Sequence, residues 1–500
     1  MVFTFWVMLA TGTLACNDHD ASLDGPSDSS TDTLPIITGR DSAHRVPADT
    51  SSLDVNTTDT AYNSDSGGFV LSDTDSARSS DSDSQTTSTD ASIDTAGADT
   101  LSITDTQSAT ADEDTSLPSD TDTLPDTGTL MNDDTSSVNI GDSDSEVPQY
   151  VTWTVMVYMA ADSNLEADML VDLSELASVQ TPYWLNILIL FDRHEYLDRT
   201  DGDWTGTRLF RVNSQVPGGL ERLADSVYLG VTDSGDTDEL DMGDGNTLDR
   251  FIQFSTNAYS ADHYALVLSG HGNGWMKKGT DEKTYHPKVI CSDDSGNRDG
   301  ISVQQVLAPL LQSYSIEVLG FDACLMAMVE VAWAVKDTVK YMIASEANES
   351  SEGWDFYTWF TEWIKSADYS AESLIKKQVV AYRRYYAETT APWQVTVSVV
   401  DTAMLPALGD AINAFMTTHV PADVVPSAMT FDVDYSEYYD LWHIADLAGD
   451  EGLKMAIEAA VIYSWSSNGP QTPGGLSIMF LPTFPDAYLQ TSFCQDLDWC

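Results

Sequence analysis

Apolar runs and amphipathic stretches alternate along most of the chain. From position 148 onward, short runs of nearly continuous apolar character predict strands that are covered on both faces, at 151–160, 184–191, 264–269 and 316–321. Stretches with helical spacing follow them, at 165–179, from the polar break 242–247 through 255, at 301–313 and at 325–337. Further strands are predicted at 341–345, 393–400 and 475–481. This alternation predicts an α/β domain, residues 148–500, with a mostly parallel central sheet flanked by helices.

The N-terminal stretch has a different pattern. Residues 1–16 are almost wholly apolar and end in Cys16, which resembles a bacterial lipoprotein signal. In such signals the cysteine is lipidated and becomes the mature N-terminus. The apolar run is too short for a spanning helix. We therefore expect an exported protein that is a bacterial cell-surface or outer-membrane lipoprotein, or is secreted, with the lipid as its only membrane contact.

Residues 17–147 consist largely of Asp, Ser and Thr. This stretch has 29 acidic residues against 3 arginines, a net charge of −26. Such a segment buries too little apolar surface to offset its ordering entropy, so we expect a disordered, extended linker. The whole chain carries −58, which leaves −32 for the remaining residues. Nucleic acid is therefore not expected as a partner.

The candidate chemistry follows two of the predicted strands. Cys324 comes directly after the apolar run 316–321, at a strand-to-helix junction where unpaired helix N–H groups would favour a thiolate. His271 follows the strand 264–269 within a glycine-rich segment. Carboxyl ends of parallel strands meet at one edge of the sheet, so the two residues can lie together. Each alone could be structural, Cys324 as a buried core cysteine and His271 as a solvated loop histidine.

Together, Cys324 and His271 form the minimal pair for acyl transfer through a thioester. Imidazole can take the thiol proton and later give it to the leaving amine. Glycine permits close backbone approach, so the N–H groups of Gly272 and Cys324 could face a developing oxyanion.

Two motifs surround the candidate residues: Asp322-Ala323-Cys324-Leu325-Met326, and Ser269-Gly270-His271-Gly272 with Trp275. Together with ordered matches at 153–162, 242–244, 344–346, 353–354, 439–441 and 475–478, they resemble the clostripain family of cysteine peptidases. This family shares a caspase-like sheet with legumain and the gingipains. The resemblance implies that His271 is the general base and Cys324 the nucleophile.

The resemblance also implies cleavage after Arg or Lys, with Asp322 in the specificity pocket. A carboxylate beside the reacting centre would pair with a basic P1 side chain. Asp322 could instead cap the turn at the strand end. A second pocket carboxylate is expected in the segment 352–355, either Glu352 or Asp355, with the motif alignment favouring Glu352. The alternative for both is a polar surface loop.

Several further expectations concern processing, metals and cysteines. The loop 276–290 bears lysines next to a Lys/Arg-specific site, so self-cleavage there and a simple solvated loop are both open, at Lys277, Lys278, Lys283 and Lys288. The chemistry requires no cofactor. Calcium stays open because clostripain itself needs it, although no stretch has calcium-loop spacing. Cys494 and Cys500 could form a disulfide, and Cys291 could be a free thiol.

The sequence thus predicts a cysteine endopeptidase that acts on proteins or peptides with basic residues. Two alternatives stay open. A member that has lost activity would be a surface-tethered binding module. A transpeptidase would use the same thioester and resolve it with an amine instead of water.

Overall fold

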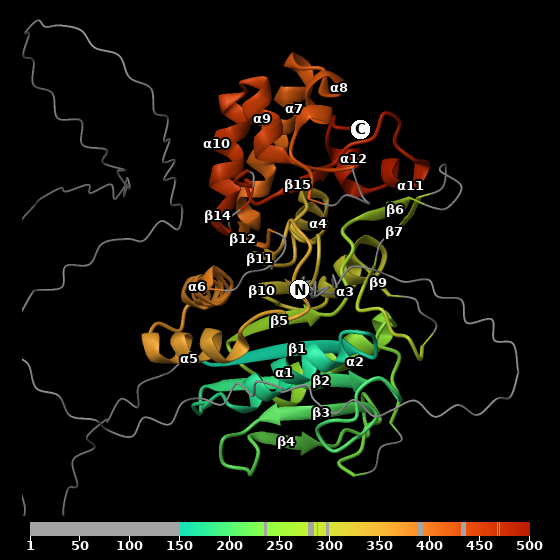
Figure 1. The fold of residues 1–500 in the computed structure, drawn as a ribbon, viewed down its shortest axis with the longest axis vertical. Helices are drawn as coiled ribbons and strands as arrows, with labels where there is room; N and C mark the ends of the chain where they lie inside the picture. Colours follow the sequence, from blue (N-terminus) through green and yellow to red (C-terminus); the bar gives the residue numbers. More distant parts are fainter. Residues whose placement is uncertain are drawn as a thin grey trace, which may run out of the picture. The chain divides into compact units, whose positions relative to one another are not determined.

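A nine-stranded sheet forms the centre of the body that the computed structural model describes (Figure 1). The described residues are 151–234, 238–278, 285–287, 289–296, 300–388, 394–431, 437–467, 469 and 471–500, with only the backbone at 276–278, 285–287 and 388. The predicted signal 1–16 with Cys16, the predicted linker 17–147, Lys283 and Lys288 lie outside the described residues. No helix in the described part of the chain is long and apolar enough to cross a membrane.

The central sheet is parallel in its middle and antiparallel at both edges. In spatial order its strands are β14 (Val461–Ser466), β12 (Thr396–Asp401), β11 (Tyr341–Ala344), β10 (Val318–Asp322), β5 (His263–Ser269), β1 (Trp153–Ala161), β2 (Leu185–Arg193), β3 (Gly206–Val212) and β4 (Leu220–Leu223). The strands from β11 to β2 run parallel, and β12, β14, β3 and β4 add to them antiparallel. The prediction of a mostly parallel central sheet is confirmed.

Helices cover both faces of this sheet. On β1, Trp153 packs edge-on against Trp363 of α5 (Phe356–Ser366), whereas Tyr158 packs against Phe251 of α2 (Gly245–Ala258). Residues an odd number apart on a strand point to opposite faces, so α5 and α2 lie on opposite sides of the sheet. All nine residues of β1 are therefore buried, as its continuous apolar character predicts. The neighbouring helices are α1 (Glu166–Ala177), α6 (Ala371–Glu388), α3 (Ala308–Leu311) and α4 (Val329–Val335).

The C-terminal part adds helices and a small sheet beside β14 (Figure 1). The helices are α7 (Leu405–Thr418), α8 (Pro421–Val424), α9 (Leu441–Ala448), α10 (Glu451–Ala460), α11 (Asp486–Leu489) and α12 (Ser492–Asp496). The strand predicted at 475–481 is only β15 (Ser477–Met479), and it pairs with β13 (Tyr438–Asp440) apart from the central sheet. Short strands β6 (Met276–Lys278), β7 (Tyr285–Pro287), β8 (Val289–Ile290) and β9 (Ile301–Ser302) form two further ribbons.

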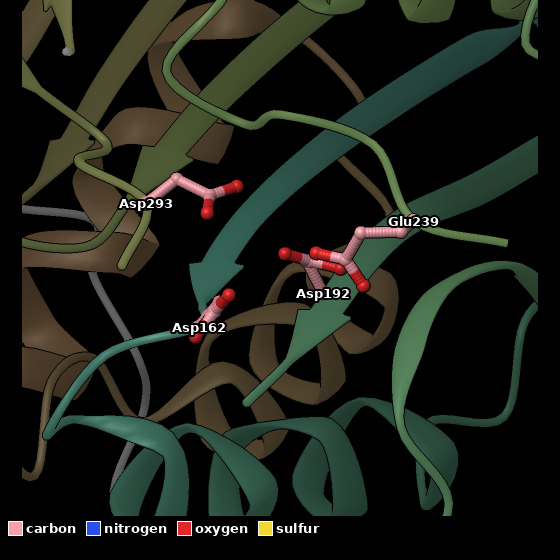
Figure 2. A group of neighbouring side chains, drawn as sticks. All are labelled: Asp162, Asp192, Glu239 and Asp293. Atoms are coloured by element: carbon pink, nitrogen blue, oxygen red, sulfur yellow. The ribbon is translucent and has the colours of Figure 1, made fainter. Parts of the chain in front are cut away.

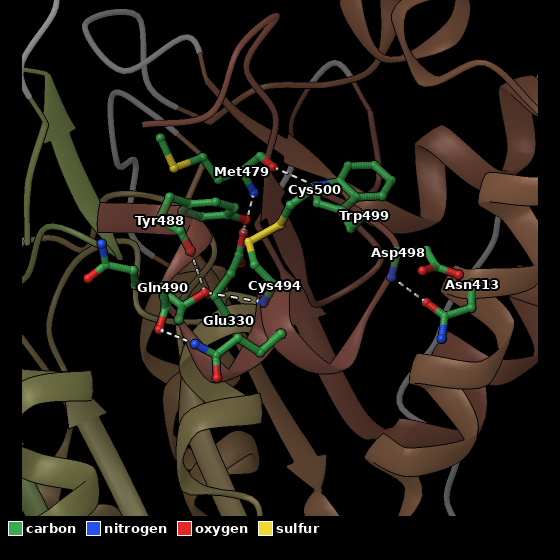
Figure 3. The surroundings of a disulfide bond; sticks show 11 residues. Glu330, Asn413, Met479, Tyr488, Gln490, Cys494, Asp498, Trp499 and Cys500 are labelled. Carbon is green, nitrogen blue, oxygen red and sulfur yellow. Dashed lines mark hydrogen bonds between the residues drawn. A yellow bond between two sulfur atoms is a disulfide. The ribbon is translucent and has the colours of Figure 1, made fainter. Parts of the chain in front are cut away.

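The chain end is tied down by a disulfide and by hydrogen bonds to the body. The structure joins Cys494 to Cys500, as the sequence allows (Figure 3). Between them, the Trp499 indole N–H donates to the Met479 carbonyl oxygen at 2.9 Å. Buried Glu330 of α4 accepts from the Met479 N–H and from the Tyr488 hydroxyl through one oxygen. These contacts fix the last residues against β15 and α4.

One predicted helix, 301–313, begins later than its pattern indicates. Ile301 and Ser302 pair with Val289 and Ile290 as a strand ribbon instead. The helical part begins at Val303 with a π-helical turn, η1 (Val303–Leu307), which is capped by the Ser302 hydroxyl. The backbone groups at the start of this stretch are paired in a strand ribbon. The helical spacing of the apolar residues does not reveal this pairing.

Candidate active site

The predicted dyad lies at the carboxyl ends of two adjacent parallel strands. Ser269 of β5 and Asp322 of β10 are register partners, and the Gly270 N–H donates to the Asp322 carbonyl oxygen at 3.3 Å. His271 and Cys324 each follow two residues later. The strand register thus brings to one sheet edge two residues that are 53 positions apart in sequence.

The segments after the two strands approach each other most closely at Gly272. A Cβ atom at this position would lie 2.7 Å from the Cys324 carbonyl oxygen and 3.0 Å from its backbone nitrogen. It would also lie 2.7 Å from the Cβ of Ala323. Only glycine fits this approach without displacing one of the two backbones. The backbones of Gly272 and Cys324 are therefore neighbours, as an oxyanion site made from their N–H groups requires.

His271 is held by three segments. Its side chain is buried, and Nε2 lies 2.5 Å from Oδ1 of Asn164, which follows β1. The His271 carbonyl oxygen accepts from the Cys291 N–H at 3.2 Å. Cys291 itself is a buried free cysteine, and burial raises the pKa of its thiol well above the usual range. Cys291 therefore supports the histidine segment through its backbone and is poorly suited to nucleophilic chemistry.

Cys324 is not at a helix N-terminus, which corrects the expected source of thiolate stabilisation. The helix predicted from 325 begins only at Val329. Leu325 has a left-handed φ of 62°, and the N–H groups of Leu325 and Ala327 bond to the carbonyl oxygens of Ala347 and Ser345. Those backbone groups are satisfied across the loop, so no helix can start there.

A backbone N–H supplies the polar contact to the sulfur instead. The Glu349 N–H donates to Sγ of Cys324 at 3.2 Å. Cys324 is 1% exposed. The nucleophilic form of a cysteine is the thiolate, which the hydrogen bond from the Glu349 N–H would stabilise.

A buried pair of carboxyl groups lies beside Cys324. Asp322 accepts from the Ser269 hydroxyl at 3.0 Å, from the Glu349 carboxyl group and from the Trp354 N–H. The Trp354 indole N–H donates to Glu349 at 3.3 Å. Burial raises the pKa of Asp322 to about 6, against these hydrogen bonds, and burial with the charge of Asp322 raises the pKa of Glu349 well above its usual range. One proton is thus shared, with Glu349 as its main holder.

A third carboxyl group, that of Asp172, approaches this pair at Gly353. Gly353 has φ of +58°, and a Cβ atom there would lie 3.0 Å from Oδ2 of Asp172 and 3.1 Å from Oδ2 of Asp322. The Tyr386 hydroxyl donates to the Gly353 carbonyl oxygen at 2.8 Å. Asp172 comes from α1 on the far side of this turn and is buried. The site is therefore strongly acidic and suited to a cationic group.

A family model for the clostripain family of C11 peptidases matches residues 157–462. The chain belongs to the clostripain family. Clostripain from Hathewaya histolytica is 30% identical over 191 residues, which are 36% of this chain and 35% of clostripain. The match thus spans about a third of that relative's length. The predicted family is confirmed.

Solved structures of C11 proteases have the same fold. A secreted C11 cysteine protease from Bacteroides thetaiotaomicron, in complex with an irreversible peptide inhibitor, has a TM-score of 0.56 at 18% identity, over 70% of this chain and 100% of that one. An inactive zymogen C11 protease from Parabacteroides distasonis has a TM-score of 0.53 at 20% identity, over 70% of this chain and 99% of that one. The predicted fold class is confirmed.

The two residues predicted to supply the second carboxylate of this clostripain-family site lie elsewhere. Glu352 is exposed and accepts from the Tyr385 hydroxyl at 2.9 Å. Asp355 caps α5 by accepting from the Thr358 N–H at 2.8 Å. Glu349 and Asp172 occupy the buried positions instead, and sequence reasoning missed both. Glutamates recur every three residues in this loop, at Glu346, Glu349 and Glu352. This spacing alone does not show which carboxyl group turns toward the protein interior.

A second acidic group in this clostripain-family chain could hold a metal ion. Oxygen atoms of Asp162, Asp192, Glu239 and Asp293 all lie within 4.8 Å of one another (Figure 2). These residues come from four separate segments, so they have no calcium-loop spacing in the sequence. Of the candidate processing lysines, Lys277 and Lys278 lie on β6, and only their backbone is described.

Proposed function

We propose that this chain is a cysteine endopeptidase that hydrolyses peptide bonds through a thioester at Cys324. The observation that carries this proposal is the convergence of Cys324 and His271 at one sheet edge beside the buried Asp322–Glu349 pair. Membership of a peptidase family supports the reaction class.

In this mechanism His271 takes the proton of the Cys324 thiol, and the sulfur attacks the substrate carbonyl carbon. The N–H groups of Gly272 and Cys324 donate to the oxyanion. The C–N bond then breaks, and His271 gives its proton to the leaving amine. In the second half His271 takes a proton from water, the resulting hydroxide attacks the thioester carbon, and the proton returns to sulfur as the acid leaves. The Glu349 N–H at 3.2 Å from Sγ stabilises the thiolate between these steps.

Specificity for Arg or Lys at P1 is the second part of the proposal. Carboxylate oxygens of Asp172 and Asp322 lie within 3.1 Å of the position that a Cβ atom on Gly353 would take, and the protonated carboxyl group of Glu349 adjoins Asp322. A buried carboxylate without a cation costs desolvation energy, and a P1 guanidinium or ammonium would offset it.

Activation by cleavage in the 276–290 loop, at Lys277, Lys278, Lys283 or Lys288, is the third part. Cys324 and His271 are 1% and 6% exposed, which leaves little access for a peptide. One structural relative is described as an inactive zymogen.

Export is the fourth part of the proposal. Another relative is described as secreted. A lipid at Cys16 would keep this chain on the cell surface.

The decisive experiment incubates the full chain, with a reductant, with fluorogenic peptides that carry Arg, Lys or Asp at P1. We expect turnover of the Arg and Lys peptides and none by the Cys324→Ala variant. With an added amine acceptor, amide products in place of acids would indicate a transpeptidase. Absence of any turnover that depends on Cys324, before and after cleavage of the 276–290 loop by added trypsin, would indicate a binding module.

A further inference from the structure

A groove of about 500 Å³ lies between α5 and α6. The two helices pack side by side (Figure 1), and the Trp359 indole N–H of α5 donates to the Leu374 carbonyl oxygen of α6 at 2.9 Å. Residues of both helices line the groove, and its two cations are Lys365 of α5 and Arg384 of α6. This groove is therefore a polar surface feature built on two regular elements.

Both cations of the groove are available to an outside anion. Arg384 is exposed, and within the described residues its side chain has neither an ion pair nor a hydrogen bond. Lys365 is 69% exposed and lies 4.0 Å from Glu362, a pair of the exposed kind that contributes little. The other acidic lining residue, Asp355, accepts from the Thr358 N–H and so caps α5. The groove is formally neutral, yet its anions are engaged and its cations are not.

Helix α6 is positively charged in an acidic protein. It has four basic residues against two acidic ones, a net charge of +2: Lys376, Lys377, Arg383 and Arg384 against Glu372 and Glu388. The chain outside the 17–147 linker carries −32. Lys377 and Arg384 are seven residues apart and share one face of the helix. An acidic partner would be repelled by most of this surface and attracted here.

The groove adjoins the carboxylates proposed to bind the P1 side chain. The hydroxyl of Tyr385, which lines the groove, donates to Glu352 at 2.9 Å, and the next residue, Tyr386, donates to the Gly353 carbonyl oxygen at 2.8 Å. A Cβ atom on Gly353 would lie 3.1 Å from Oδ2 of Asp322. One short loop thus joins the P1 carboxylate to the groove, and a substrate that places its P1 side chain beside Asp322 leads past one end of it.

We propose that the α5–α6 groove binds an acidic segment of the substrate that neighbours the basic P1 residue. Arg384 can hold an Asp or Glu carboxylate through two parallel hydrogen bonds, and Lys365 supplies a second charge. The rings of Tyr357 and Tyr385 offer the aromatic surface that protein interfaces favour. This inference rests on the proposed function and narrows its substrates to chains in which a basic residue lies near acidic ones.

Binding is tested on the full chain carrying Cys324→Ala, which cannot cleave the probes. The probes are two fluorescent peptides with a central Arg, flanked on both sides by Glu residues or by Gln residues. By anisotropy at low salt, we expect the Glu peptide to bind roughly tenfold more tightly, and the advantage to vanish in about 1 M NaCl. The net negative charge of the body alone predicts the opposite order, so the comparison separates the groove from the general surface.

The double variant Lys365→Glu, Arg384→Glu should lose the preference for the Glu peptide. Lys365 and Arg384 are exposed, so these substitutions should leave the melting temperature within a few degrees of the parent's. Arg250→Glu reverses an arginine on α2, across the central sheet, and is the control, which should retain the preference. Equal binding of the two peptides by the parent, or a preference that survives in the double variant, would overturn the assignment of the groove.

Catalysis distinguishes this inference from the proposed function. In the chain with Cys324 intact, Arg384→Glu should raise KM for the Glu peptide roughly tenfold more than KM for the Gln peptide. Cleavage of both peptides with one KM by the parent would refute the groove and leave the peptidase standing. A chain that prefers the Glu peptide in the binding assay yet cleaves neither would refute the proposed peptidase and leave the groove as a binding site.

Discussion

The carboxyl group of Glu349 donates a hydrogen bond to that of Asp322, and both are buried beside Cys324. Because Glu349 holds the proton, Asp322 carries the negative charge of the pair. The glutamine side-chain amide can donate the same hydrogen bond and does not titrate. Glu349→Gln should therefore keep kcat/KM for an Arg peptide within about threefold. Glu349→Ala removes the donor and should cost ~1–3 kcal/mol, roughly tenfold or more in kcat/KM.

The exposed Glu352 provides the matched control for this prediction. Glu352→Gln should behave as the wild type in the same assay, because its carboxylate faces solvent and bonds only to Tyr385 among the contacts described for it. A loss greater than tenfold in Glu349→Gln would show that Glu349 binds substrate as an anion, which contradicts the assignment of the proton.

Asp322 should determine the preference for a basic P1 residue. Asp322→Asn removes a charge-assisted hydrogen bond worth ~1.5–3 kcal/mol, so kcat/KM for an Arg peptide should fall roughly 10- to 150-fold. Rates of alkylation of Cys324 by iodoacetamide should not fall, because the neighbouring negative charge disfavours the thiolate. An Arg peptide cleaved at the full rate would refute the role of Asp322.

The same carboxyl group predicts an acid limb in the pH profile. Burial raises the pKa of Asp322 to about 6, so the anion that binds P1 forms above that pH and is lost below it. We expect kcat/KM for an Arg peptide to fall about tenfold per pH unit below about 6. Stability should change in the opposite direction, since a raised carboxyl pKa makes the folded state lose stability as pH rises from about 4 to 6. In Asp322→Asn this acid limb should disappear from the profile.

The positions of His271 and Cys324 at two strand ends could be predicted because strand ends are readable from local pattern. The apolar runs before His271 and Cys324 correspond to β5 and β10, and parallel pairing sets both residues at one edge. Buried strands retain their apolar character whatever the neighbouring loops do, which is why the strand predictions agree with the structure to within a few residues at β1, β2 and β5.

The loop contacts were not readable in the same way. The segment from Leu325 to Met328 has helical spacing, yet a left-handed residue and cross-loop hydrogen bonds delay α4 to Val329. Glu349 could not be chosen over Glu352 from the sequence, because a loop lacks the regular periodicity that assigns side chains to a buried or an exposed face. The four carboxylates around Asp162 are contributed by four segments, and only the folded chain brings them together.

Gly272 should be indispensable for activity because its backbone abuts that of Cys324. In Gly272→Ala the new Cβ would lie within 3.0 Å of backbone atoms of Cys324, so the histidine segment must move away. Displacement of about 1 Å can cost about 100-fold in rate, and we expect a loss of that size in kcat with little change in melting temperature. Gly452→Ala on α10 is the control: its Cβ would meet only Asp450 Oδ1 at 3.3 Å, and activity should be unchanged. Wild-type kcat in Gly272→Ala would show that the two backbones do not form the oxyanion site.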